Sequence, residues 1–409
     1  MPIEPRAKAG RVGSPSLARG CGANASGWPV CPRVGWLALI LSASLATIGR
    51  AALWESPRWA LVGDVGAALG YDSNIYATPV RVADGFLAVA PAARLFRRNS
   101  LSALEFQAGA VRHNYFSHAA ANSTDWRLQG LLVYPAEVES LFTQKAEINW
   151  ARATALNDDL RRRLREDRFQ AAWDADVYDT GRAAFMLRMS YASIDPAKDE
   201  DAIEGVEKKT VGGTLDWKKN DFLRLGVGYD LALDDASGRS GSAGPLRNLS
   251  HTVSLRGRGQ FFPKVSGQAF VGVAQVDYSG RFSLAGVKYV GGGDLSWKAT
   301  ERFEGSLHVE RSSGISSDGQ AVDRTGIEIG ARHALIGGFG IGLYGAATAD
   351  VYRGRSSRND DGLSMGASLD YDLTGRFQAS LRYDHDSRSS NLLTSYDRDR
   401  ILFRCGLRL

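Results

Sequence analysis

The chain has 409 residues, of which 44% are hydrophobic and 23% charged, so it is too apolar for a disordered protein. Its 46 glycines beside only 12 prolines exclude a collagen-like repeat and argue against a helix-rich enzyme. The net charge is +5, but much of that excess lies in the first 58 residues, so it gives no indication of nucleic-acid binding.

A secretory leader with an extended lead-in is the first predicted element, and it covers residues 1–51. Residues 34–49 form an uncharged apolar stretch, basic residues precede it, and a small-x-small triplet ends at Ala51. This order is typical of a signal peptide that is cleaved after Ala51. The alternative is a membrane-spanning helix, which needs about 20 apolar residues and therefore a longer stretch. The mature chain would keep one cysteine, Cys405, and so could form no intramolecular disulfide.

Alternation of apolar and polar residues follows the leader, and nearly every segment as far as the C-terminus shows it. It is clearest in residues 223–231, 303–310, 363–373 and 377–383. Alternation with period two predicts β-strands that have one apolar and one polar face. No later stretch is apolar over 18 residues, which argues against a helical membrane protein.

Short and long connections alternate between these strands. The short turns lie near 97–100, 135–139, 179–181, 218–221, 262–264, 299–301, 336–338 and 374–376. The long polar connections lie near 72–84, 113–124, 153–167, 195–206, 234–249, 279–285, 311–323, 353–361 and 386–398. This count predicts eighteen strands of about eleven residues each. Sixteen strands are the alternative, because residues 84–96 and 262–290 alternate poorly.

An even number of strands, alternating short and long connections and a secretory leader together favour an all-β, transmembrane, up-and-down antiparallel β-barrel over residues 59–409. The barrel would lie in the bacterial outer membrane, with short turns in the periplasm. Aromatic residues near the short turns would form the periplasmic girdle of such a barrel: Tyr134, Phe142, Tyr178, Phe185, Trp217, Phe222, Phe261, Trp297, Phe303, Phe339, Tyr371 and Phe377. A large soluble barrel or solenoid with these aromatics in its core is the alternative.

The polar face of each strand would line the lumen, and charged residues on that face are the candidate pore-lining set. They are Arg127, Lys145, Arg188, Arg224, Asp230, Arg256, Arg258, Asp294, Glu304, Glu328, Arg332, Asp370 and Arg382. So many charges cannot be buried dry unless they are paired, so water or salt-bridge layers must fill the interior. Barrels of 16 to 18 strands leave an aqueous channel. The mixed signs argue against a strongly ion-selective constriction.

Catalytic and metal-binding patterns are weak in this sequence. The best enzymatic candidate is the segment Asp384-His385-Asp386, close to a long loop and to Asp360-Asp361. Carboxylates beside histidine at a barrel mouth resemble the outer-membrane proteases of the omptin type, which supply the alternative of a surface hydrolase. The six histidines and Cys405 form no zinc pattern. We therefore expect a protein without enzymatic activity, cofactor or metal.

The opening of the first strand and loop carries a family resemblance. Residues Gly70, Tyr71, Asp72, Ser73 and Asn74 resemble the opening segment of the putative β-barrel porin 2 family, and Tyr396-Asp397-Arg398-Asp399-Arg400 resembles its closing segment. Members of that family are often associated with extracellular polysaccharide, so the resemblance implies a conduit in exopolysaccharide or capsule export. A general diffusion porin and a structural or adhesive barrel are the alternatives. The expected partners are outer-membrane lipid, lipopolysaccharide, the outer-membrane assembly machinery and a periplasmic polysaccharide-export protein, but no nucleic acid.

Overall fold

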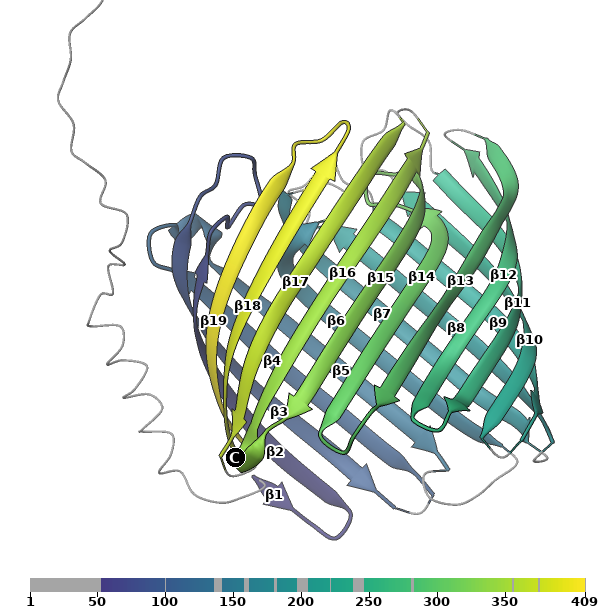
Figure 1. Ribbon diagram of the computed structural model, residues 1–409, viewed down its shortest axis with the longest axis horizontal. Helices are drawn as coiled ribbons and strands as arrows, with labels where there is room; N and C mark the ends of the chain where they lie inside the picture. Colours follow the sequence, from purple (N-terminus) through teal and green to yellow (C-terminus); the bar gives the residue numbers. More distant parts are fainter. Residues whose placement is uncertain are drawn as a thin grey trace, which may run out of the picture. The chain divides into compact units, whose positions relative to one another are not determined.

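The computed structural model shows one antiparallel sheet that closes on itself (Figure 1). It describes residues 53–99, 101–135, 142–157, 162–179, 182–196, 205–220, 222–237, 246–280, 283–354, 357–373 and 376–408. The predicted leader, residues 1–51, lies outside the described residues. The described residues contain no helix that is long and apolar enough to cross a membrane.

The sheet is built from a two-residue strand and eighteen long strands of the described chain. Their bounds are β1 Trp54–Glu55, β2 Trp59–Asp72, β3 Asp84–Arg98, β4 Ala103–Tyr115, β5 Ser123–Tyr134, β6 Thr143–Asn157, β7 Arg162–Asp179, β8 Ala183–Pro196, β9 Gly205–Lys218, β10 Leu223–Ser237, β11 Leu246–Phe262, β12 Val265–Gly280, β13 Leu284–Lys298, β14 Phe303–Ile315, β15 Ala321–Ala334, β16 Phe339–Arg353, β17 Arg358–Asp372, β18 Phe377–Ser390 and β19 Tyr396–Arg408. Two 3₁₀ turns, η1 Ala119–Ala121 and η2 Ile336–Gly338, lie in connections.

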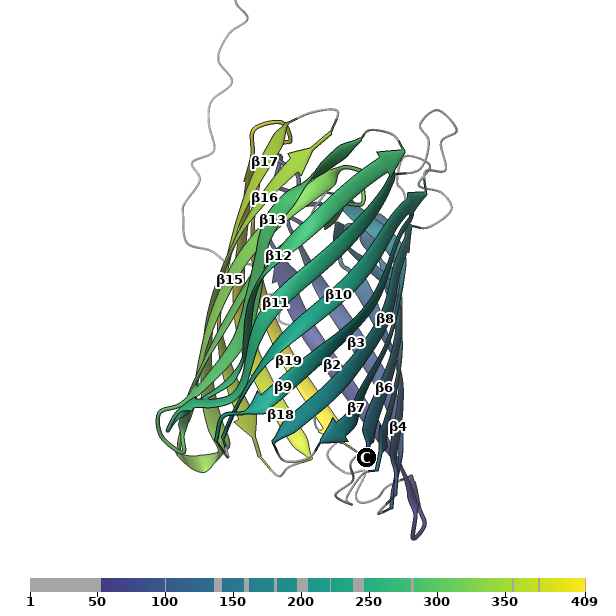
Figure 2. The same ribbon diagram turned by 90° about the vertical axis from the view of Figure 1, so that its right-hand side faces the viewer.

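Each long strand pairs with its neighbours in the chain, and β19 pairs with β2 to close the barrel. The eighteen strands of β2 to β19 confirm the prediction of a closed antiparallel barrel. The barrel is broader in Figure 1 than in the view turned by 90° in Figure 2, so its cross-section is elongated.

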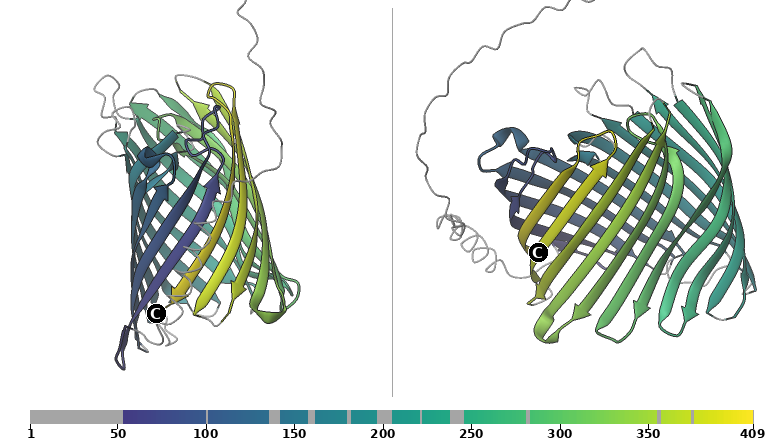
Figure 3. Two further views of the ribbon diagram at one scale, coloured as in Figure 1. Left: turned by 90° about the vertical axis from the view of Figure 1, so that its left-hand side faces the viewer. Right: turned by 45° about the horizontal axis from the view of Figure 1, so that its top comes forward.

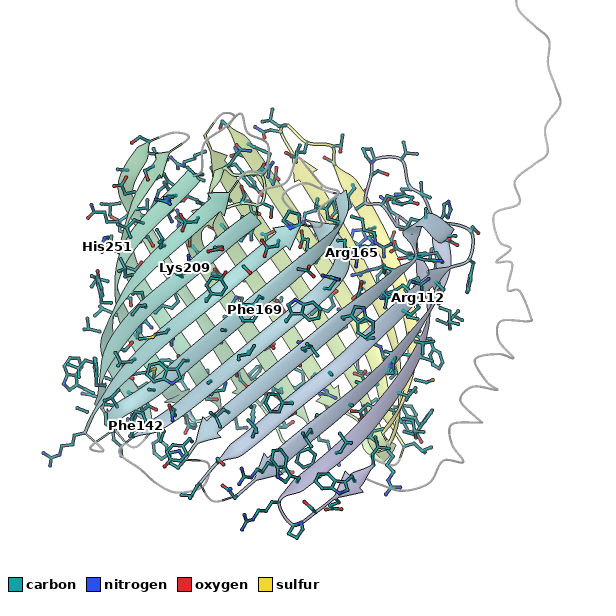
Figure 4. The ribbon with its side chains drawn as sticks, turned by 180° about the vertical axis from the view of Figure 1, so that it is seen from behind. Arg112, Phe142, Arg165, Phe169, Lys209 and His251 are labelled. Carbon is teal, nitrogen blue, oxygen red and sulfur yellow. The ribbon has the colours of Figure 1, made fainter. Side chains whose placement is uncertain are left out.

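Alternation places apolar side chains on the outer face. In β10, Leu225, Val227 and Tyr229 are exposed, while Gly226 and Gly228 between them are buried on the inner face. Large apolar side chains are similarly exposed on most strands, as a wall in contact with lipid requires. The aromatic girdle is present at the ends of the short turns, where Tyr134, Phe185, Trp217 and Trp297 are exposed. In Figure 4, Phe142 lies at this end, while Arg112, Arg165, Lys209 and His251 lie nearer the opposite end.

The strands extend further toward the extracellular side than the sequence predicts. The long connection expected over residues 153–167 is shorter, because β6 and β7 pair as far as Asn157 and Arg162. Likewise, the connection expected over 311–323 reduces to the residues between Ile315 and Ala321. Residues 162–167 of β7 are polar on both faces apart from Leu164, and the ends of β14 and β15 pack against other parts of the protein, so apolar alternation marks neither extension.

The two regions of poor alternation are also regular strands, and in both an inward-folded segment covers the inner wall. Ile75 in the first loop packs against Phe86, Ala88 and Tyr115 on the inner face of β3 and β4. A second apolar cluster joins Val276 and Tyr278 of β12 to Ala321 of β15, with Ile315 packed against it. The inward side chains of these strands pack against protein, so they are apolar like the outward ones. Both faces of the strand are then apolar, and the period-two signal is lost. Figure 3 (right) shows the extracellular end of the barrel turned toward the viewer.

Candidate functional site

Ion pairs between strands line the inner wall from β7 to β11, and one of them, between Arg258 of β11 and Asp216 of β9, crosses β10. Arg188 Nε lies 3.1 Å from Asp174 Oδ1, Arg258 Nε lies 2.8 Å from Asp216 Oδ2, and Arg256 pairs with Asp230. The side chains of Arg188 and Asp174 remain 43% and 42% exposed. Charges that were buried dry would carry a large desolvation cost, whereas these pairs keep contact with the lumen.

Two glycines make room for the pair between Arg256 and Asp230. A Cβ atom at Gly212 of β9 would overlap Asp230 Oδ1, and a Cβ atom at Gly228 of β10 would overlap the Arg256 guanidinium. The side chains of this ion pair therefore lie flat against glycine backbone instead of projecting into the lumen. Part of the high glycine content thus serves close approach at the inner wall.

A cavity of about 340 Å³ lies beside these pairs, over β8 to β14. Asp294 on its wall accepts a hydrogen bond from Gln268 Nε2 at 3.2 Å, and its Oδ1 lies 2.7 Å from His308 Nδ1. The Arg256 guanidinium lies 5.8 Å from the centre of the Phe270 ring. The cavity wall therefore combines both charge signs with one aromatic face.

All thirteen candidate pore-lining residues lie on the inner face by strand register. The structure brings several of them together with polar partners in addition to the pairs already described. These contacts join Lys145 to Glu147 at 2.5 Å, Glu304 to Ser296 at 2.7 Å, and Arg382 to Asp384 at 2.6 Å. Their role in conduction stays a prediction.

The end of the β14–β15 hairpin folds into the barrel, which the sequence does not predict. β14 contacts β10 and β11, although neither is its neighbour in the sheet. The Tyr278 hydroxyl donates to the carbonyl oxygen of Gly314 at 3.2 Å. Asp323 binds Lys288 Nζ at 2.6 Å and Arg353 Nε at 3.3 Å. This inward hairpin narrows the lumen from one side.

The inward bend separates β14 from β13 in the extracellular half. Pairing joins 291–298 of β13 to 304–311 of β14, and β13 residues 284–290 have no partner on β14 (Figure 1). Val287 and Tyr289 are therefore 68% and 76% exposed, whereas Val273, the partner of Tyr289 on β12, is 43% exposed. We call this stretch the open seam. The only sequence signal for it was the poor alternation of residues 262–290.

The family-like motif forms a clasp where the first and last strands meet. Asp72 is 1% exposed and holds the Arg398 guanidinium with both carboxylate oxygens. Asn74 is fully buried and donates from Nδ2 to the carbonyl oxygens of Thr78 and Asp397, at 2.7 and 3.1 Å. Ser73 Oγ accepts from the Asp399 N–H at 2.7 Å. The opening and closing segments thus bind each other directly, which the sequence did not predict.

The candidate catalytic segment is divided between the two faces of β18. Asp384 faces inward and accepts from the Tyr344 hydroxyl at 2.6 Å, and Asp386 faces inward toward Arg400 at 3.3 Å. His385 faces outward, with Nδ1 2.8 Å from Asp399 Oδ1. Asp360 is buried against Arg358 at 3.2 Å. Alternation along a strand therefore separates the histidine from the two flanking carboxylates, and the water-activating arrangement is not assembled from them.

The sequence of residues 250–409 matches the family model described as "Putative beta-barrel porin 2". These residues include the closing segment at 396–400 and most of β11 to β19, and the match is to the family that the opening and closing segments resemble. The opening motif at 70–74 lies outside the matched range. No curated protein matches the chain by sequence.

Solved structures similar to this chain include OpdL from Pseudomonas aeruginosa, with 12% identity and a TM-score of 0.47 over 85% of this chain and 99% of that one. OccAB4 from Acinetobacter baumannii has 9% identity and a TM-score of 0.46 over 85% of this chain and 98% of that one. The siderophore receptor PirA from Pseudomonas aeruginosa has 11% identity and a TM-score of 0.44 over 87% of this chain and 81% of that one.

By its closed eighteen-strand fold and its apolar outer wall, the chain is a bacterial outer-membrane β-barrel of the porin type, and through residues 250–409 its sequence matches the putative beta-barrel porin 2 family.

Proposed function

We propose that the barrel is a water-filled pore for hydrophilic molecules and that it acts without enzymatic activity. The observation that carries this proposal is the solvent exposure of charged side chains on the inner wall, where Arg188, Asp174 and Asp294 are 43%, 42% and 59% exposed. Charges at that exposure need water around them, and water in the lumen of a wide barrel supports passage of polar solutes.

The proposed cargo is a polysaccharide chain on its way out of the cell. Both signs of charge are present along the wall, so a long neutral or weakly charged polymer meets no ring of one sign. Aromatic rings such as Phe270 and Tyr344 face the lumen and offer flat surfaces for sugar rings. The family resemblance supports the same cargo. A periplasmic polysaccharide-export protein is the proposed partner, and lipid and lipopolysaccharide surround the outer wall.

Conductance through planar lipid bilayers tests the pore. Asp294→Cys and Leu295→Cys, both in a Cys405→Ser background, place a thiol on the inner and outer face of β13. A charged methanethiosulfonate reagent should lower the current through the Asp294→Cys protein and leave the Leu295→Cys protein unchanged. A membrane that stays sealed at high protein load contradicts the pore.

Deletion of the gene tests the cargo separately. We expect the polysaccharide in the medium to fall and polysaccharide to accumulate in the periplasm, with both effects reversed by the wild-type gene. Unchanged export by the deletion strain, together with normal conductance of the purified protein, would leave a general diffusion porin as the function.

A further inference from the structure

We propose that a pocket at the extracellular mouth binds the carboxylate of an acidic sugar residue and that Arg163 is the main residue that binds it. The choice of a sugar rests on the proposed function. The choice of an anion rests on the pocket itself.

The pocket has a volume of about 430 Å³ and lies inside the barrel, between the clasp and the top of the β6–β7 hairpin. Beyond Arg152, β6 leaves β5 and continues as a hairpin with β7. This places Arg163 opposite Tyr115 and the clasp strand β19. The volume lies within the range of about 300–1,000 Å³ that is usual for small-molecule sites.

Cations outnumber acids on the lining. Arg163, Arg388, Arg398 and Arg400 all line the pocket, whereas its acids are Asp72 and Asp386. Asp72 is used by Arg398, and Asp386 lies 3.3 Å from Arg400. Both acids of the lining are therefore held by arginines of β19, and neither of them pairs with Arg163.

The strongest indication of a bound anion is the environment of the Arg163 guanidinium. No carboxylate of the described residues forms an ion pair with it; its Nη2 lies 3.4 Å from Ser123 Oγ, and its guanidinium lies 5.1 Å from the centre of the Tyr115 ring. Among the described residues, its buried Nη1 atom has no hydrogen-bond acceptor, and neither has the buried Nε atom of Arg400. Buried donors of a charged group require an acceptor, and a carboxylate fits the planar guanidinium fork.

The remaining lining suits a sugar ring. Phe86 and Tyr115 form an apolar floor beside the arginines, and Ile75 and Leu156 close its edges. An aromatic and aliphatic surface next to a charged fork fits the C–H face of a sugar whose carboxylate projects to one side. An uncharged sugar would leave the buried donors of Arg163 without a partner, so the pocket should discriminate by charge.

Isothermal titration calorimetry of the barrel folded in detergent tests this site, with trigalacturonate as the probe. We expect Arg163→Gln to weaken binding at least tenfold, whereas Arg165→Gln should leave it unchanged, because Arg165 is exposed and does not line the pocket. Arg163→Lys should recover part of the affinity, because the charge remains while the fork is lost. Heat-modified migration on gels confirms that each variant is folded.

Neutral maltotriose and inorganic phosphate are the comparison ligands. Binding of trigalacturonate but not of maltotriose supports the proposal. Equal binding of maltotriose, full replacement by phosphate at the same concentration, or unchanged affinity of Arg163→Gln overturns it. The titration requires no ion flow, so the two proposals can fail separately. A protein that binds trigalacturonate but does not conduct disproves the pore and supports the binding site. A protein that conducts but does not bind supports the pore and disproves the binding site.

Discussion

The clasp between β19 and β2 and the open seam between β13 and β14 join strands of one barrel in different ways. At the clasp, the first and last long strands meet, and buried polar groups such as Asp72 and Asn74 bind across the junction. At the open seam, a short periplasmic connection already joins the two strands, and pairing stops after half of β13. Strands that no turn connects need side chains to hold them together, whereas hairpin partners can separate at their far end.

Beside the open seam, the β14–β15 hairpin makes contacts inside the barrel in place of pairing with β13. The hairpin that leaves β13 binds inside the barrel through Ile315, Ala321 and the ion pairs of Asp323. Free strand edges are not tolerated in hydrocarbon, because backbone groups need hydrogen-bond partners. The inward hairpin must therefore be stabilised enough to offset the loss of β13–β14 pairing.

Disulfide trapping should show the largest contrast between paired and separated parts of the seam. In a Cys405→Ser background, Leu295→Cys with Leu307→Cys joins a true cross-strand pair and should oxidise almost completely. Tyr289→Cys and Ser313→Cys would lie opposite each other if the register continued, and this pair should remain reduced. Electrophoresis after mild oxidation measures both. Efficient trapping of the second pair would show that the hairpin returns to β13.

Asp72→Asn should give the largest loss of stability at the clasp. It leaves Arg398 buried without its charge partner, which costs about 3–5 kcal/mol. Urea unfolding in detergent, followed by tryptophan fluorescence, measures the free energy of unfolding. The Asp72→Asn/Arg398→Gln double variant should lose less than the sum of the two single variants. A loss below about 1 kcal/mol for Asp72→Asn would mean that the clasp does not hold the closing strands.

Asp323→Asn should release the inward hairpin and cost about 1–3 kcal/mol, because Lys288 and Arg353 lose their shared acceptor. In planar bilayers, the variant should conduct more current with more frequent steps, since a loosened hairpin blocks less of the lumen. Asp277→Asn, an exposed change on β12, is the matched control and should behave as wild type. Identical currents for Asp323→Asn and wild type would contradict the anchoring role.

Arg81→Ala should have the smallest effect. Its ion pair with Asp397 lies beside the clasp, but the two side chains are 53% and 48% exposed, so the pair is worth about 0–1 kcal/mol. Urea unfolding under the same conditions should place this variant close to wild type. A loss as large as that of Asp72→Asn would show that the rim, not the buried pair, closes the barrel.

Much of the fold could be predicted from sequence, because lipid on one side and water on the other impose period two on each strand. The count of eighteen strands and the inner face of residues such as Arg188 and Asp230 follow from that pattern. The inward segments could not be predicted, because contacts such as those of Ile75 with Phe86 and of Tyr278 with Gly314 join distant parts of the chain. In the sequence, they are indicated only by a strand whose two faces are both apolar, as in residues 84–96.

The candidate site was predicted less completely for the same reason. Alternation shows that Arg256 and Asp230 face the lumen, but the two glycines that let them pair belong to β9 and β10 and become informative only when the register is known. Arg163 lies in a region that the sequence suggests is a polar loop. Because β6 separates from β5 beyond Arg152, the β6–β7 hairpin places Arg163 on the lining of the pocket at the extracellular mouth.

The clasp has a consequence for biogenesis. Asp72 precedes Arg398 by 326 residues, so the first strand is synthesised and exported long before its partner exists. Until the last strand arrives, a partly assembled sheet would leave the Asp72 carboxylate without a matching cation, and burying it would be costly. The final strand thus supplies a charge as well as hydrogen bonds, which makes a complete barrel much more favourable than one that lacks its C-terminal hairpin.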